Sequence, residues 1–295
     1  MVGENANYLQ PKTLQELQVC LKDMTEESVV LAGGTDLMVS IRAKKTHIDT
    51  YLSLCSLNDM KGIYEKDGWI RIGAMSTHAE VANNNKIKTY FTALSMSCDH
   101  VGSAQIRNKG TIGGNIMNAN PAGDVLPCIM LYDGEFEIFT PDGIMRRISI
   151  DEFISESGKT TLGKNEILMA IWLPIEYEKK SCFVKLGSRT EVTIAQISLC
   201  LSWKKSEDEY SDIKGFIGAV DKKPLEIEEI ASILGNKPFE TEKLNTLSSL
   251  LSNKISTIRM NRKRESKLKI YEHEKLYKER AVKGVVYDAV SCMKD

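Results

Sequence analysis

The chain has 295 residues, with 39 Lys and Arg against 40 Asp and Glu, which gives a formal net charge of −1 at pH 7. This balance argues against general nucleic-acid binding, which usually needs a clear basic excess. Apolar content of 42% and charged content of 27% are those of an ordinary globular protein, and the length suits about two domains.

The seven cysteines are scattered along the chain, and no two of them form a C-x-x-C pair. Such a set indicates reduced thiols in a cytoplasmic protein and not a disulfide framework. It also argues against an iron–sulfur cluster in this chain, because cluster ligands are grouped thiolates. The four histidines (His47, His78, His100 and His273) show no metal spacing, so we expect surface or core residues and no metal site. We expect neither a signal peptide nor a membrane span.

The first part of the chain predicts a compact unit of roughly fifty residues in which strands alternate with helices. Thr13 with Glu16 is a capping-box pattern, and leucines follow it at helical spacing, which predicts a helix. The β-branched and apolar run 29–32 predicts a short strand, and a second strand is expected near 51–54.

A double glycine, Gly33-Gly34, follows the first of these strands and precedes a helix that Thr35 or Asp36 would cap. Phosphate groups favour such a junction, because the first helical amides and the helix dipole both point at them. The pattern is not G-x-G-x-x-G, so a Rossmann dinucleotide site is not predicted.

A second unit begins near residue 58. It is predicted to contain a strand at 69–75, a helix opened by the capping box of Thr77 and Glu80, and a further helix at about 90–99. The last of these helices leads into a stretch rich in Gly and Asn.

This stretch, 106–124, contains a second double glycine and is the most informative part of the sequence. Gly113-Gly114 is expected to leave two successive backbone amides uncrowded, so that they form a partly positive nest for a phosphate. Thr111 and Asn115 flank the pair with a hydroxyl and an amide that can complete the hydrogen bonds of the anion. The alternative is an ordinary glycine-rich turn between a helix and a strand. Two double-glycine motifs, one in each unit, suit a pyrophosphate held from two sides.

A hairpin is predicted from the segments 136–140 and 144–150, which flank a Pro-Asp-Gly turn. The nearly continuous apolar run 166–173 predicts a buried strand that Pro174 ends. The polar residues after Pro174 mark a domain boundary.

The last third places strands before helices, which indicates an α+β unit. Its strands are expected near 182–186, 194–203 and 213–220, and its helices from residue 227 onward. The C-terminal helix has one apolar face. The stretch 254–280 carries ten Lys and Arg against four Glu. A basic helix there can bind nucleic acid or an acidic partner, but we favour a solvated helix face.

Three motifs connect the sequence to a known family: AGGTDL at 32–37, TIGGN at 111–115 and AGD at 122–124. They resemble the FAD-binding (medium) subunit of the xanthine dehydrogenase family of molybdenum hydroxylases, and the resemblance runs along the whole chain. It implies an α+β fold in which a two-subdomain FAD-binding domain of the PCMH type precedes a smaller α+β C-terminal domain.

The domain boundaries that we expect follow from this resemblance. The FAD-binding domain is expected at 1–176, with subdomains of about 1–57 and 58–176, and the C-terminal domain at 177–295.

The resemblance also implies which residues bind FAD, without a covalent link. The two double-glycine loops are implied to enclose the pyrophosphate. Asp124 is implied to hydrogen-bond cofactor hydroxyls, with helix capping as its alternative role, and Lys185 to reach the flavin, where a cation stabilises the reduced anion. No catalytic residue is expected, because the flavin carries its own redox chemistry. The implied cofactor-binding residues are Val30, Leu31, Ala32, Gly33, Gly34, Thr35, Asp36, Leu37, Val101, Thr111, Ile112, Gly113, Gly114, Asn115, Asp124, Leu168 and Lys185.

The function implied is that of an electron-transfer subunit. Electrons would come from a [2Fe–2S] small subunit and pass through FAD to NAD or another acceptor, while a molybdopterin large subunit would hydroxylate the substrate. Several NAD-using members carry an acidic residue where this chain has Val192, which leaves the acceptor open.

Two other functions are considered. One is a stand-alone flavin oxidoreductase, which is disfavoured because neither double-glycine loop contains a His or Cys that could tether FAD. The other is a non-catalytic nucleotide-binding scaffold, which would stay colourless when incubated with FAD.

Overall fold

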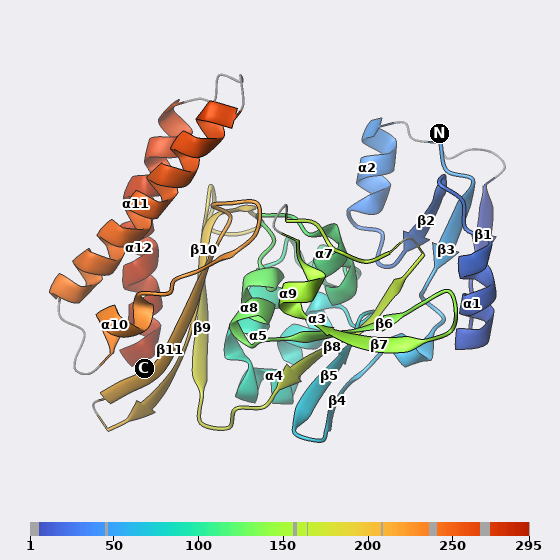
Figure 1. Ribbon diagram of the computed structural model, residues 1–295, viewed down its shortest axis with the longest axis horizontal. Coiled ribbons are helices and arrows are strands. Elements are labelled where there is room, and N and C mark those ends of the chain that lie inside the picture. The colour runs from blue at the N-terminus through green and yellow to red at the C-terminus, as the bar shows by residue number, and fades with distance from the viewer. Residues whose placement is uncertain are drawn as a thin grey trace.

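The computed structural model describes residues 6–44, 47–155, 158–163, 165–207, 209–235, 241–265 and 272–294. Three β-sheets follow one another along the long axis of the molecule, with helices between and beside them (Figure 1). Each sheet comes from one consecutive part of the chain, 7–53, 63–174 and 180–226. The predicted α+β architecture is confirmed, and the domain boundaries stay predictions.

The first sheet is parallel, with the order β1-β3-β2, and matches the predicted alternation of strands and helices. Its elements are β1 (Asn7–Leu9), α1 (Leu14–Lys22), β2 (Ser28–Leu31), α2 (Leu37–Lys44) and β3 (Thr50–Ser53). Because the strands are parallel, the loop between β2 and α2 lies at the carboxyl edge of the sheet, where such sheets commonly bind ligands.

The capping box predicted for α1 is only half formed. The hydroxyl of Thr13 accepts a hydrogen bond from the backbone N–H of Glu16 at 3.2 Å. The carboxylate of Glu16 accepts from the N–H of Lys12 at 2.7 Å, and not from that of Thr13.

The second sheet is antiparallel, with the order β4-β5-β8-β6-β7. Its strands are β4 (Ile63–Lys66), β5 (Trp69–Gly73), β6 (Glu135–Phe139), β7 (Met145–Ser149) and β8 (Ile167–Pro174). The predicted hairpin is β6–β7, and the predicted buried strand is β8, which is central. Arg147 and Arg71 stack on Trp172 of β8, at 4.4 and 6.0 Å from the ring centroid, so the strand is covered even on the face that lacks helices.

Short helices connect β5 to β6 and pack on the other face of this sheet (Figure 1). They are α3 (His78–Asn83), α4 (Asn85–Tyr90), α5 (Thr92–Asp99), α6 (Ala104–Arg107), α7 (Ile112–Asn118) and α8 (Val125–Leu131), and η1 (Asn58–Met60) and α9 (Ile150–Phe153) lie at the two ends of the unit. The capping box of Thr77 and Glu80 is confirmed at α3. The helix predicted at about 90–99 is shorter, because Phe91 separates α4 from α5 with a non-helical φ of −133°.

The third sheet is antiparallel, with the order β12-β11-β10-β9. Its elements are β9 (Lys180–Gly187), β10 (Ala195–Ser206), β11 (Glu209–Gly218) and β12 (Leu225–Glu226), followed by α10 (Ile230–Leu234), α11 (Thr241–Glu265) and α12 (Glu272–Lys294). The predicted order of strands before helices is confirmed. The predicted apolar face of α12 is buried at Val282, Val285, Val286, Ala289 and Val290.

The basic stretch 254–280 is not one helix. It covers the end of α11 and the beginning of α12, and residues 266–271 between them lie outside the described part of the chain.

The main hydrophobic core crosses both predicted domain boundaries. It joins Leu17 and Leu52 of the first unit to the helices and sheet of the second, and it continues to Phe183, Cys200 and Phe216 of the third sheet. The third sheet is therefore covered on one face by α10 and α12, with α11 packed on α12, and on the other face by α5 and α8. None of the helices in the described ranges is both long and apolar enough to cross a bilayer.

Candidate functional site

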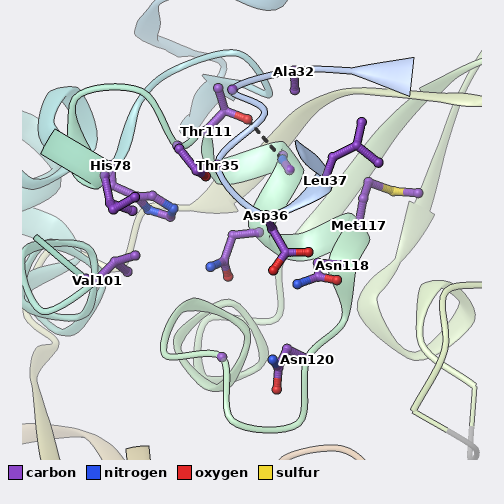
Figure 2. A pocket seen from close by; sticks show the side chains of 18 of the residues that line it. Ala32, Thr35, Asp36, Leu37, His78, Val101, Thr111, Met117, Asn118 and Asn120 are labelled. Carbon is purple, nitrogen blue, oxygen red and sulfur yellow. Dashed lines mark hydrogen bonds between the residues drawn. The ribbon is translucent and has the colours of Figure 1, made fainter. Parts of the chain in front are cut away.

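A cavity of about 790 Å³ lies where the β2–α2 loop, the helices around α7 and the end of β9 meet. Its volume falls within the range of about 300–1,000 Å³ that is usual for small-molecule sites. Figure 2 shows the β2–α2 loop, with Ala32, Thr35, Asp36 and Leu37, and the α7 region, with Thr111, Met117, Asn118 and Asn120, arranged around this cavity.

The cavity is lined by all the predicted cofactor-binding residues except Leu31 and Ile112. Ile112 is fully buried in the main core. Leu31 packs beneath the loop, where its Cδ1 would lie 3.1 Å from a Cβ placed on Gly34. Leu31 is the last residue of β2 and Ile112 the first of α7, and the structure gives both side chains a packing role.

The β2–α2 loop presents a row of free amides to the cavity. The backbone N–H groups of Gly33, Gly34, Thr35 and Asp36 donate no hydrogen bond to any residue in the described ranges. They stand immediately before α2, so the helix dipole adds to their positive field. Gly34 has a φ of 70°, a conformation that favours glycine. This geometry matches the anion nest predicted for the first double glycine.

The second double glycine has a different role from the one predicted. Gly113 and Gly114 lie in the first turn of α7, so the segment is neither a nest nor a turn. The N–H of Gly113 donates to the carbonyl oxygen of Ala74 at 2.9 Å, and that of Gly114 to Oγ1 of Thr111 at 3.1 Å, the bond dashed in Figure 2. The prediction that these two amides form a phosphate nest is therefore wrong.

Close packing explains the glycine at position 113. A Cβ on Gly113 would lie 2.6 Å from the Cβ of Ala74, so only glycine lets α7 approach the end of β5 this closely. Likewise, a Cβ on Gly33 would collide with the carbonyl oxygen of Lys109, so that glycine holds the β2–α2 loop against the segment before α7.

Asp124 and Lys185 form a buried ion pair in the wall of the cavity. Their side chains are 6% and 5% exposed, and Nζ of Lys185 lies 2.5 Å from Oδ2 of Asp124. Lys185 also donates to the carbonyl oxygen of His100 at 3.1 Å. Burial raises the pKa of Asp124, although the neighbouring Lys185 ammonium opposes this shift.

The second carboxylate oxygen of Asp124, Oδ1, is buried and has no partner among the described residues. Asp124 stands at the N-cap position of α8 but makes no capping hydrogen bond. Helix capping, the alternative weighed for this residue, is therefore not its role. A buried acceptor without a donor is uncommon in proteins, and here it faces a ligand-sized cavity.

Several cavity residues were not expected from the sequence, notably His78, Asn118, Asn120 and Glu166. His78 was expected to be a surface or core histidine. It is 2% exposed, and burial, reinforced by Arg107, lowers its pKa to about 4, so the imidazole is neutral at pH 7. The one feature of the sequence that could have pointed to His78 is its position directly after the capping Thr77, at the start of a predicted helix.

The loop after β9 closes one side of the cavity. Arg189, Val192 and Ile194 line it, and Arg189 donates to the carbonyl oxygen of Val192 at 2.8 Å. Val192 has a φ of 49°, which is unfavourable for a β-branched residue. Val101 and Leu168, both predicted, complete the apolar part of the wall. In the described residues no group of three or more side chains could hold a metal ion.

Comparison with known proteins assigns the family. The family described as "FAD binding domain in molybdopterin dehydrogenase" matches residues 4–176, more than half of the chain. The chain belongs to the FAD-binding subunits of the molybdenum hydroxylases. Within this family, the FAD subunit of nicotinate dehydrogenase from Eubacterium barkeri is 27% identical over 286 residues, which cover 94% of this chain and 92% of that protein.

A second relative is the xanthine dehydrogenase FAD-binding subunit of Escherichia coli, 26% identical over 82% of this chain and 84% of its own. Among solved structures, carbon monoxide dehydrogenase from Hydrogenophaga pseudoflava has a chain that superposes with a TM-score of 0.83 at 21% identity, covering 99% and 98% of the two chains. The fold of this FAD-binding subunit is thus that of the medium subunits, and its cofactor is FAD, as predicted.

Proposed function

We propose that the cavity holds one non-covalent FAD and that the subunit carries electrons from a [2Fe–2S] partner to NAD or another acceptor. The observation that supports this most is the distribution of unsatisfied polar groups inside one cavity. Four free amides, Gly33 to Asp36, offer an anion site at one place, and the free Oδ1 of Asp124 offers an acceptor at another. A pyrophosphate fits the amides, and a cofactor hydroxyl fits the carboxylate.

Lys185 tunes the flavin in this proposal. Its ammonium has three donors, of which Asp124 and the His100 carbonyl take two in the described structure. One donor and the positive charge remain available on the cavity side. Bound FAD supplies reversible one- and two-electron transfer, and a buried cation nearby favours its reduced, anionic form.

The proposed electron donor and electron acceptor are inferred from the relatives of this chain. Two relatives that match over most of their length are named FAD subunits of nicotinate and xanthine dehydrogenases. We infer a [2Fe–2S] small subunit and a molybdopterin large subunit as partners, with the organic substrate bound by the large subunit. NAD is one candidate acceptor at the loop that carries Arg189 and Val192.

The cofactor assignment is tested on the purified chain. We expect one FAD per chain, much weaker binding of FMN, which lacks the pyrophosphate, and release of the yellow chromophore into the supernatant after acid precipitation. Because His78 lines the cavity, a covalent link to its imidazole is the clearest opposing outcome. Chromophore that stays with the acid pellet would show a covalent link to the protein and refute non-covalent binding.

A further inference from the structure

His78 is held in the cavity wall by its backbone. It is the first residue of α3, directly after Thr77, which forms the capping box with Glu80. Its N–H donates to the carbonyl oxygen of Gly110 at 3.0 Å, and Thr77 forms a β-bridge with Thr111. The backbone of His78 is therefore fixed relative to the segment that leads into α7.

The imidazole makes no hydrogen bond within the part of the chain that the structure describes. It is 2% exposed, its Nδ1 is a buried atom without a hydrogen bond, and its Nε2 makes none with any residue of the described ranges. A buried polar group left unsatisfied destabilises the fold, so it is retained where a ligand completes it. Burial keeps this imidazole neutral at pH 7, with one N–H donor and one acceptor nitrogen.

The ring lies beside the free amides of the β2–α2 loop. A Cβ placed on Gly110 would be 3.3 Å from Cδ2 of His78 and 3.3 Å from Oγ1 of Thr35, so both groups border the same point. In Figure 2 the side chain of His78 points across the cavity toward Thr35 and Asp36. Arg107, which contributes to the lowered pKa of His78, lies nearby but does not line the cavity and is ion-paired with Asp99 at 3.5 Å. Within the cavity, free amides, a hydroxyl and an imidazole N–H together match an anionic ligand.

We propose that His78 is a binding residue that donates its imidazole N–H to the phosphate portion of the dinucleotide and so selects phosphate-bearing ligands over the bare flavin. This inference rests on the proposed FAD site and adds to it a residue that lies outside both double-glycine loops. A hydrogen bond to the phosphate would also explain why a polar side chain occupies this buried position.

The test measures ligand binding to the full chain stripped of flavin. Dissociation constants for FAD, ADP and riboflavin are compared between the wild type, His78→Leu and His78→Asn. We expect His78→Leu to weaken FAD and ADP at least about tenfold and to leave riboflavin unchanged, because only the first two carry phosphates. His78→Asn keeps an N–H donor and should recover part of the affinity. His47→Leu, at an exposed histidine outside the cavity, serves as the matched control.

A structural role for His78 would give a different pattern. Unfolding of the flavin-free His78→Leu protein should occur at the same or a higher temperature than that of the wild type, because the variant removes an unsatisfied buried group. Equal weakening of all three ligands, unchanged FAD and ADP binding, or a clear loss of stability in the flavin-free state would each overturn the inference. Failure of the wild type itself to bind FAD would instead refute the proposed site, and this inference with it.

Discussion

The ion pair of Asp124 and Lys185 is the residue-scale feature with the largest expected energetic effect. Removing one partner of a buried pair leaves an uncompensated charge, which costs about 3–5 kcal/mol. We expect Lys185→Met to lower the unfolding free energy of the flavin-free chain by this amount at pH 7, as measured by denaturant titration. The loss should shrink at lower pH, where Asp124, whose pKa burial already raises, takes up a proton.

A double-mutant cycle completes this test. Asp124→Asn combined with Lys185→Met removes both charges, so the double variant should be more stable than the sum of the single losses predicts. Strict additivity of the two losses would mean that the residues do not interact in solution.

His78 makes the stability of the flavin-free chain depend on pH. Its pKa falls from 6.5 to about 4 on folding, so between these values the unfolded chain binds more protons than the folded one. Stability therefore decreases as pH falls through this window, by up to about 3 kcal/mol for this group. The slope of unfolding free energy against pH between about 4 and 6.5 should be shallower in His78→Leu. Identical slopes in the two proteins would contradict a depressed pKa.

The sequence predicted only some of the residues that line the cavity. The motif resemblance picked out Asp124 and Lys185 separately, but no local pattern shows that residues 61 positions apart share a buried hydrogen bond. His78 was missed because its significance comes from what surrounds it: a backbone bond to Gly110 and the absence of a partner for its ring.

At the scale of elements, the two double glycines differ in how well they tolerate a larger side chain. Gly33→Ala places a methyl group against the Lys109 carbonyl, so we expect a loss of about 1–3 kcal/mol in unfolding free energy along with loss of flavin. At Gly114, in α7, a Cβ meets mainly Oγ1 of Thr111 at 3.0 Å, so the fold should hold in Gly114→Ala. Because Gly114 lines the cavity, the added methyl group narrows it, and FAD affinity should fall about tenfold.

Gly284→Ala in α12 is the control for these substitutions. A Cβ at this position meets nothing within 4 Å, so alanine should raise stability by about 1 kcal/mol without affecting the flavin. Thermal unfolding and FAD titration distinguish the three variants. A Gly33→Ala protein as stable as the wild type would contradict the close contact between the β2–α2 loop and the segment before α7.

Elements with a clear periodicity were predictable, and α7 was not. The β6–β7 hairpin, strand β8 and the apolar face of α12 follow from alternation, a continuous apolar run and helical spacing. Two adjacent glycines argue against a helix locally. Contacts distant in sequence, from the Gly113 amide to the Ala74 carbonyl and from α7 to β8, impose helix on α7. Local sequence does not contain that information.

For the whole molecule, the decisive prediction concerns the partners. In the native host the chain should co-purify with a [2Fe–2S] subunit and a molybdopterin subunit. Isolated, it should be reduced by dithionite but should not turn over purines, nicotinate or similar heterocycles, and addition of the partners should confer that turnover. Hydroxylation by this chain alone, free of molybdenum, would contradict the subunit assignment and favour a stand-alone oxidoreductase.

The cavity draws its wall from residues as far apart as Val30 and Ile194. On the ribosome, chains grow at about 5–20 residues per second, so the free amides of the β2–α2 loop are made on the order of ten seconds before Lys185. Until β9 has been made, the nascent chain lacks Lys185 and the loop after it, and so lacks one wall of the cavity. If the cavity holds FAD as proposed, capture of the cofactor by a complete site follows the synthesis of β9.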